Sequence, residues 1–328
     1  MRIVILLGVI ALLGVVISLG PRVSLDLNSP LPTAVPDVAD DDLTALASWL
    51  ANSEAVFNDI TPGAEKKLAW ANPSEPVRTP WSLVYIHGFS ATRQETHPLS
   101  EQIAAQLGAN VYYARLAGHG RSGQALTDAL ATDWLDDTHA AYEIGQRIGE
   151  RVIVIGVSTG ATLATWLALQ DNIDDLAALI LVSPNFGLAN RSATVLTKPW
   201  GLALAKALSG ETRSFEPVNE GHKRYWTVSY GIAAAAQMMA LVDAINAAPL
   251  ERVTTPTLLV RSETDTVIDI AAADKTLGRL QNPLNATHIV TDATDPWGHV
   301  IAGDILSPES TPGITEAVID FVNRLNGG

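Results

Sequence analysis

The chain has 328 residues, no cysteine and a formal net charge of −14 at pH 7. This charge argues against a nucleic-acid partner, because binding to phosphates requires clustered lysine and arginine. The absence of cysteine excludes disulfides and thiolate metal sites, and the seven histidines lack the close spacing of zinc ligands. The length is compatible with one α/β domain that carries an insertion.

The amino terminus carries a nearly unbroken apolar run, Ile3 to Gly20, behind Arg2. Its 18 residues reach the lower limit for a membrane-spanning helix. A cleaved signal peptide normally has an apolar region of about 7 to 15 residues. The small residues Ser18 and Gly20 suit cleavage, but Pro21 obstructs it, which favours an uncleaved anchor. Residues 1–20 are therefore expected to be a membrane anchor, or else a signal segment. Either way the body is exported, as a membrane-anchored periplasmic or extracellular domain or as a secreted protein.

A proline-rich stretch follows, and residues 21–39 are predicted to be a linker. Asp40, Asp41 and Asp42 then precede apolar residues at helical spacing, which predicts a surface helix.

Strands and helices then alternate up to residue 182, which is typical of a mostly parallel sheet flanked by helices. The predicted strands are 67–71, 82–86, 110–116, 152–155 running into Gly156, and 177–182. The predicted helices are 98–107, 133–147 with Thr132 as the N-cap, and 161–169.

The alternation lapses from about residue 185 to residue 249, where glycines, basic residues and aromatic residues are mixed. We expect an inserted cap here, including a helix over 231–245 whose Met238 and Met239 pack in the core or face a substrate. Strands at 257–261 and 286–290 and a helix at 314–325 complete the pattern.

The most informative stretch is Gly156-Val157-Ser158-Thr159-Gly160, between a β-branched strand and an apolar helix. A sharp turn from strand to helix projects the side chain of Ser158 outward, and Gly156 and Gly160 provide the room that this turn needs. The helix start leaves backbone N–H groups unpaired, so the Thr159 N–H can point at a developing oxyanion. This pattern is a nucleophile elbow.

Two loops carry a resemblance to a known family. His87-Gly88-Phe89-Ser90 follows an early strand, and Gly118-His119-Gly120-Arg121-Ser122 follows the next one. With the elbow, these motifs resemble the α/β-hydrolase fold superfamily, in its monoacylglycerol lipase and carboxylesterase branch of serine hydrolases. The resemblance covers roughly residues 67–325 and implies that residues 40–328 form one such domain with a cap at about 185–249.

The same resemblance assigns the remaining site residues. Gly88 lets its loop approach the nucleophile, so the Phe89 N–H is the second oxyanion donor, while His87 supports the loop. Asp265 occupies the position of the catalytic acid after a late strand, with Glu263 and Asp269 as competitors. His299 follows 34 residues later, and the order Ser158, Asp265, His299 is the order of this fold.

The predicted activity is hydrolysis of carboxylic esters of apolar acyl groups through an acyl-enzyme on Ser158, without metal or organic cofactor. A small or lipid-like ester and, through the amino terminus, a membrane are the expected partners. Three alternatives use the same triad: acyl transfer, thioester hydrolysis and peptide hydrolysis. A non-catalytic, membrane-tethered binding protein is the alternative from another class.

Overall fold

The computed structural model describes residues 18–28, residue 35 and residues 42–325. The predicted targeting segment up to residue 17 and much of the predicted linker lie outside the described residues. Within the described ranges, no helix combines the length and the apolar character needed to cross a membrane.

The described residues form a central sheet of seven strands in the order β1-β3-β2-β4-β5-β8-β9. All neighbouring strands are parallel except β1 and β3, so the predicted α/β fold with a mostly parallel sheet is confirmed. The strands are β1 (Lys67–Ala69), β2 (Thr79–Ile86), β3 (Asn110–Tyr113), β4 (Gly149–Val157), β5 (Leu176–Val182), β8 (Thr257–Ser262) and β9 (Ala286–Val290).

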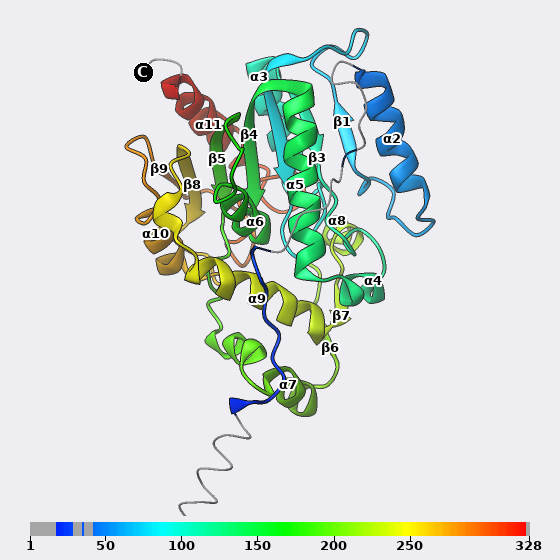
Figure 1. The fold of residues 1–328 in the computed structure, drawn as a ribbon, viewed down its shortest axis with the longest axis vertical. Helices are drawn as coiled ribbons and strands as arrows, with labels where there is room; N and C mark the ends of the chain where they lie inside the picture. The colour runs from blue at the N-terminus through cyan, green and yellow to red at the C-terminus, as the bar shows by residue number, and fades with distance from the viewer. Residues whose placement is uncertain (1–17, 29–34, 36–41, 326–328) are drawn as a thin grey trace, which may run out of the picture.

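Helices cover both faces of this sheet (Figure 1). On one face lie α3 (Leu99–Leu107) and α11 (Thr311–Leu325), and on the other α5 (Ala131–Ile148) and α6 (Thr159–Leu167). Alternate residues of β4 serve the two cores, so Val154 packs on the α5 and α6 side, while Ile153 and Ile155 pack on the α3 and α11 side. A strand buried on both faces requires an unbroken apolar run, which explains the sequence of β4.

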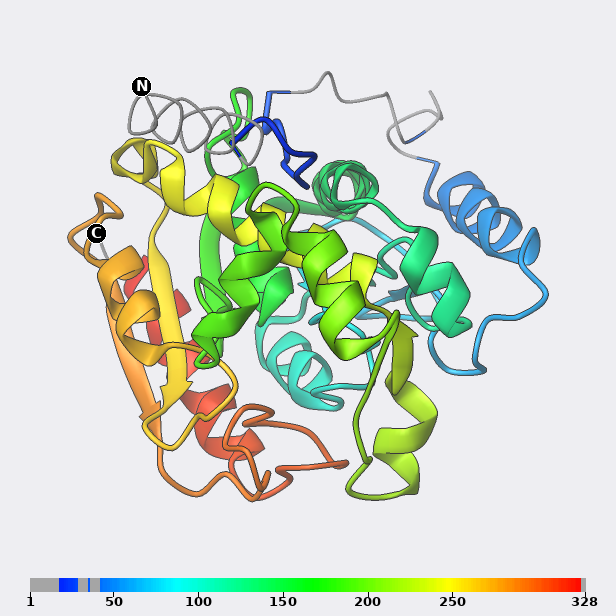
Figure 2. The ribbon, with the colours of Figure 1, turned by 90° about the horizontal axis from the view of Figure 1, so that it is seen from below.

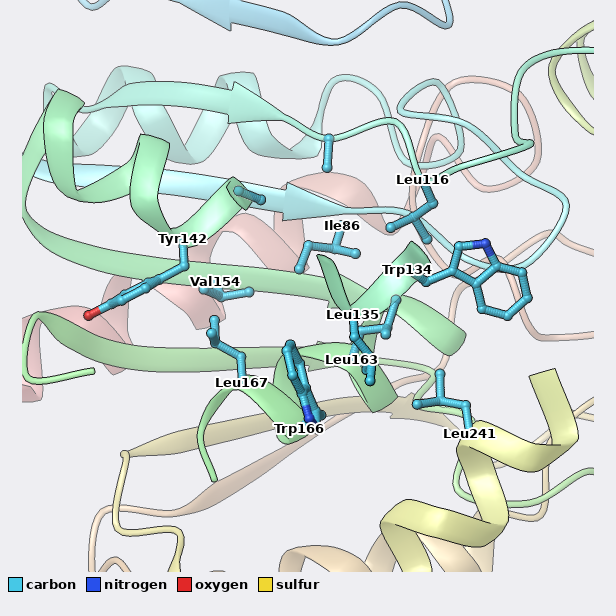
Figure 3. Packing of buried hydrophobic residues seen from close by; sticks show 14 of the residues in the cluster. Ile86, Leu116, Trp134, Leu135, Tyr142, Val154, Leu163, Trp166, Leu167 and Leu241 are labelled. Atoms are coloured by element: carbon cyan, nitrogen blue, oxygen red, sulfur yellow. The ribbon is translucent and has the colours of Figure 1, made fainter. Parts of the chain in front are cut away.

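Large side chains fill the core between α5, α6 and the sheet (Figure 3). Trp134 and Trp166 are both buried there, and Leu163 and Leu241 pack beside them. Leu241 belongs to α9 (Ile232–Ala247), so this core extends from the sheet into the region predicted to be a cap.

Helix α5 begins earlier than the sequence predicted. Its N-cap is Leu130, and Thr132 lies inside the first turn, so the assignment of Thr132 as the N-cap was wrong. The Asp133 carboxylate accepts a hydrogen bond from the Leu130 N–H at 2.9 Å and satisfies a donor at the helix start. This contact places the start of the helix before Ala131.

The region from residue 185 to residue 249 lies across the carboxyl ends of the strands (Figures 1 and 2). It contains η1 (Arg191–Thr197), α7 (Gly201–Ser209), β6 (Thr212–Ser214), α8 (Glu220–Tyr225), β7 (Ser229–Gly231) and α9. Met238 and Met239 of α9 are buried in the core, as one of the two readings of these residues expected.

The described part of the predicted linker is docked on the protein. Val23, Leu25 and Leu27 pack against the main core, and the Trp200 N–H donates to the Pro21 carbonyl at 2.8 Å. Residues 20–28 therefore run along the cap and along α6, with their apolar side chains in contact with the body.

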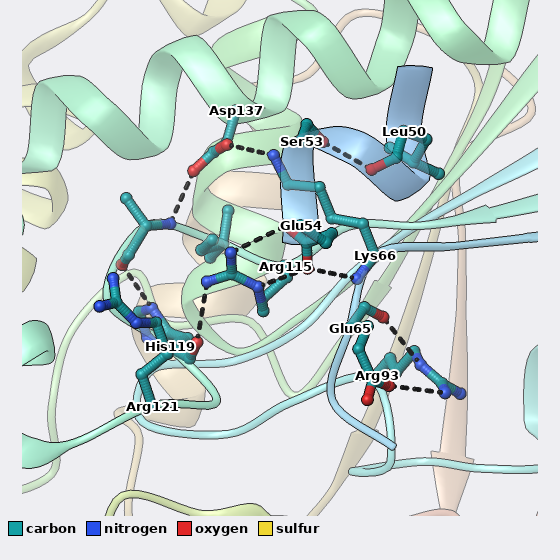
Figure 4. Close-up of polar contacts among 12 residues, drawn as sticks. Leu50, Ser53, Glu54, Glu65, Lys66, Arg93, Arg115, His119, Arg121 and Asp137 are labelled. Atoms are coloured by element: carbon teal, nitrogen blue, oxygen red, sulfur yellow. Dashed lines mark hydrogen bonds and ion pairs between the residues drawn. The ribbon is translucent and has the colours of Figure 1, made fainter. Parts of the chain in front are cut away.

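The remaining helices are α2 (Leu43–Ala55), α4 (Gly123–Asp128), η2 (Leu250–Arg252) and α10 (Ile270–Leu277). A buried ion pair ties α2 to the end of β3 (Figure 4). The Arg115 guanidinium donates to both oxygens of Glu54, at 2.7 and 2.8 Å. Burial opposes the ionisation of Glu54, but the hydrogen bonds and the charge of Arg115 hold the pKa of this carboxyl below its usual value.

We predict that Arg115→Met lowers the free energy of unfolding by about 3–5 kcal/mol, because it leaves the Glu54 carboxylate buried without its partner. Denaturant titration measures this loss. Arg121→Met is the matched control, since Arg121 also lies over the Phe57 ring but pairs with Asp59 in a more exposed position. The control is expected to cost at most about 1 kcal/mol. Equal losses in the two variants would contradict the prediction.

Candidate active site

Ser158 lies at the corner between β4 and α6 in a strained conformation, with φ 52° and ψ −114°. The backbone around this corner explains why positions 156 and 160 are glycine. A Cβ on Gly160 would lie 2.1 Å from the Ile86 carbonyl oxygen, and a Cβ on Gly156 would lie 2.5 Å from the Gly160 carbonyl oxygen. Both glycines therefore allow close backbone packing, which presses the end of β2 against the turn that carries Ser158.

The predicted catalytic side chains meet in one hydrogen-bonded chain. His299 Nε2 lies 3.1 Å from Ser158 Oγ, and His299 Nδ1 lies 2.8 Å from Asp265 Oδ2. Ser158 and His299 are 141 positions apart in the sequence. The loops after parallel strands β4, β8 and β9 bring them together, because parallel strands end at the same edge of the sheet.

Backbone hydrogen bonds orient the Asp265 carboxylate toward His299. Its other carboxylate oxygen, Oδ1, accepts hydrogen bonds from the Val267 and Ile268 N–H groups at 2.8 and 3.0 Å. The two competing acids lie elsewhere: Asp269 accepts a hydrogen bond from the Ala272 N–H at the start of α10, and Glu263 is exposed.

The loop that carries His299 is fixed by buried groups on both sides. Asp295 Oδ2 accepts hydrogen bonds from the His299 and Val300 N–H groups, both at 2.9 Å, and Ser183 Oγ donates to the His299 carbonyl at 2.7 Å. Gly298 has φ 63°, and a Cβ there would lie 2.7 Å from the Thr264 carbonyl oxygen. This loop is therefore packed closely against the loop that carries Asp265.

The loop after β2 brings the predicted oxyanion donors to the nucleophile. A Cβ on Gly88 would lie 3.2 Å from Ser158 Cβ, so the loop passes directly beside Ser158. Neither the Phe89 N–H nor the Thr159 N–H has a hydrogen-bond acceptor among the described residues. Two free amides beside a nucleophile are suited to bind a developing negative charge.

His87 lies behind this loop and is fully buried. Its Nε2 accepts a hydrogen bond from the Leu116 N–H at 3.1 Å, so Nδ1 carries the proton and donates to the Gly88 carbonyl at 2.9 Å. Burial lowers the pKa of His87 to about 4. A neutral imidazole with both nitrogens engaged can hold this loop in place.

His299 has the opposite electrostatics. Burial alone would lower the pKa of His299, but the hydrogen bond and charge of Asp265, together with the charges of Glu95 and Asp295, raise it above 6.5. An imidazole surrounded by carboxylates accepts a proton readily, which is the property that a general base requires.

Sequence reasoning missed two buried acids at this site, Glu95 and Asp295. Glu95 Oε2 accepts a hydrogen bond from the Gly88 N–H at 2.8 Å, and Asp295 holds the His299 backbone. Asp295 stands four positions before His299, which is a signal that could have been used. Glu95 lies in an ordinary polar stretch, and nothing in its local pattern indicates burial.

The sheet, its flanking helices and the elbow define an α/β-hydrolase fold. The chain belongs to the Hydrolase_4 family, described as serine aminopeptidase S33, whose model matches residues 78–294.

Individual proteins and structures are also similar to this chain. A thermostable monoacylglycerol lipase from Bacillus sp. (strain H-257) is 22% identical over 234 residues, which cover 68% of this chain and 89% of the lipase. A structure of the metagenome-derived lipolytic enzymes LipS and LipT has a TM-score of 0.64 at 19% identity, and covers 81% of this chain and 99% of that one. The monoglyceride lipase of Saccharomyces cerevisiae has a TM-score of 0.61 at 12% identity, with coverages of 80% and 91%.

If His299 acts as the base, its neutral form is the active one, so activity is lost as the pH falls through its pKa. Because that pKa is raised, we predict that the acid limb of kcat/KM has its midpoint above pH 6.5. A pH series on a p-nitrophenyl ester measures it, and a midpoint below 6.5 would contradict the prediction.

Two carboxylate variants, one at Asp265 and one at Asp269, provide a test of the triad and its control. Asp265→Asn is expected to reduce kcat by about 10⁴-fold. Asp269→Asn is expected to leave both kcat and the pH profile unchanged, because Asp269 has no contact with His299.

Proposed function

We propose that this protein hydrolyses carboxylic esters of lipid-like, apolar acyl groups through a Ser158–His299–Asp265 triad. One observation carries the proposal: Ser158 Oγ, the His299 imidazole and the Asp265 carboxylate form a single hydrogen-bonded chain, beside two amides without an acceptor in the described part of the chain. Membership of a hydrolase family and the lipase relatives support the assignment to carboxylic ester hydrolases.

The proposed mechanism follows from the geometry. His299 Nε2 takes the hydroxyl proton as Ser158 Oγ attacks the ester carbon, and Asp265 stabilises the imidazolium that forms. The Phe89 and Thr159 N–H groups bind the oxyanion, and each such donor is typically worth about 3–4 kcal/mol in the transition state. His299 then returns the proton to the leaving alcohol, and water releases the acyl group by the same route.

The surroundings of the triad support an apolar acyl group. Tyr230 of the cap packs edge-on against Phe89, with their ring centroids 5.2 Å apart. Trp226, also in the cap, packs in one apolar cluster with Val300, the residue next to His299. Aromatic and aliphatic side chains thus flank both the proposed oxyanion loop and the proposed base, an environment that favours hydrocarbon. Two of the relatives are named as lipases of monoacylglycerols.

The test is Ser158→Ala, which should reduce the hydrolysis of p-nitrophenyl octanoate and of a monoacylglycerol by about 10⁴-fold or more while the protein stays folded. Ser100→Ala is the matched control, because Ser100 is also a buried serine but lies on α3, away from the triad. Unchanged turnover in Ser158→Ala would end the proposal. Absence of Ser158 labelling by a fluorophosphonate probe would favour a non-catalytic binding protein.

Peptide hydrolysis is the second candidate, because the family is described as a serine aminopeptidase. The same purified protein should be offered an aminoacyl p-nitroanilide, an acyl thioester, and an ester with an added acceptor alcohol. Ester hydrolysis faster than the other reactions supports the leading proposal. A preference for the anilide, the thioester or the acceptor would assign peptidase, thioesterase or acyltransferase activity, respectively.

We also propose that the apolar segment up to Gly20 holds the enzyme at a membrane, with the catalytic domain exported. Support comes from the apolar run itself and from Leu19, Leu204 and Leu208, which are exposed where residues 20–21 meet the cap.

Vesicle flotation tests this proposal with the full chain and with a variant that lacks residues 1–20. The full chain is expected to float with phospholipid vesicles and the shortened variant to remain at the bottom, since most of the apolar surface is removed. Equal flotation of the two proteins would contradict membrane attachment through this segment.

A further inference from the structure

A buried carboxylate that the mechanism above does not use lies beside the proposed active site. Glu95 is 2% exposed and follows the loop that carries Phe89. Its Oε2 accepts a hydrogen bond from the Gly88 N–H at 2.8 Å. A carboxylate buried at this depth is costly unless its hydrogen bonds and charge contacts compensate, so its contacts define what it does.

The first consequence concerns the direction of the Phe89 N–H. The peptide unit between Gly88 and Phe89 is planar and trans, so its carbonyl and its N–H point in opposite directions. His87 Nδ1 holds the carbonyl end of this unit, and Glu95 holds the N–H of the preceding unit. Two buried side chains thus fix consecutive peptide planes, and between them they orient the Phe89 N–H.

The second consequence concerns packing. A Cβ on Gly88 would lie 2.8 Å from Glu95 Oε1 and 3.2 Å from Ser158 Cβ, so the Gly88 backbone is held between these two residues. A Cβ on Gly303, four positions after His299, would lie 2.8 Å from the Glu95 carbonyl oxygen. Glu95 therefore sits where the proposed oxyanion loop, the nucleophile and the loop after His299 meet.

The charges around Glu95 are few. Burial raises the pKa of Glu95 to about 7, against the opposing effects of the Gly88 N–H, of His299 and of the Tyr85 hydroxyl from β2. No lysine or arginine is among the groups that shift it within the described chain.

We propose that Glu95 is a positioning residue of this active site: it holds the Gly88 backbone so that the Phe89 N–H meets the oxyanion. This inference rests on the proposed function, because it assigns Glu95 to the same reaction.

Glu95→Gln separates the charge from the hydrogen bond. Glutamine retains an oxygen that can accept from the Gly88 N–H, but it carries no charge. Labelling of Ser158 by a fluorophosphonate uses the same base and oxyanion donors and needs no knowledge of the natural substrate. We expect the labelling rate of Glu95→Gln to stay within about fivefold of that of the unaltered protein, because the acceptor for the Gly88 N–H is kept.

Glu95→Leu removes the acceptor as well. We expect the labelling rate and kcat on p-nitrophenyl octanoate to fall by about 10²–10³-fold with KM little changed, since the loss is confined to the transition state. Glu101→Gln is the matched control, a carboxylate on α3 that pairs with His97 and does not contact Gly88. It should preserve the labelling rate, kcat and KM.

The proposal is overturned if folded Glu95→Leu reacts within twofold of the unaltered protein, or if Glu95→Gln loses as much rate as Glu95→Leu. Should Glu95→Leu fail to fold, Glu95→Ala, which also removes the acceptor, is compared with Glu95→Gln by the same criteria. These outcomes differ from failure of the proposed function, in which the unaltered protein itself is not labelled at Ser158.

Discussion

The site depends on one backbone constraint, the strained turn at Ser158. Its positive φ is tolerated because Gly156 and Gly160 let the start of α6 pack against β4 and against the end of β2. The same close approach places the Ile86 and His87 carbonyls beside Gly160, and so sets the position of the loop that follows β2. The conformation of the nucleophile and the location of the oxyanion donors are therefore consequences of a single packing contact.

Around that turn, each reactive group is supported by buried hydrogen-bonding groups. Two backbone N–H groups hold the Asp265 carboxylate, Asp295 holds the His299 backbone, and His87 and Glu95 hold Gly88. These partners limit the motion of the side chains that would react, which lowers the cost of reaching the productive geometry. The acids also differ in their partners: a fully buried Glu95 with few donors has a raised pKa, whereas Glu54 beside Arg115 has a lowered one.

Much of this arrangement could be predicted from the sequence, because the features that carry it are local. Strands buried on both faces are apolar runs in the sequence. The elbow, the His87-Gly88 loop, Asp265 and His299 all follow such strands, so their positions and their order could be recognised. The start of α5 was misplaced at Thr132 because a capping carboxylate at Asp133 outweighed the preference for threonine. Glu95 was missed for a different reason. Its role depends on a contact with Gly88 that only the folded loop creates, and an exposed glutamate would have the same neighbours in sequence.

The docked stretch before α2 adds a connection that the chain order does not require. Residues 20–28 touch the cap through Pro21 and Trp200 and touch α6 through Leu27, whose carbonyl accepts a hydrogen bond from Trp166 Nε1 at 3.4 Å. The cap is thus connected to the body by the chain at its two ends and also by the non-covalent contacts of residues 20–28. A pulling force applied at the amino terminus would therefore act first on the cap and on α6, the helix that follows Ser158, and only then on the sheet.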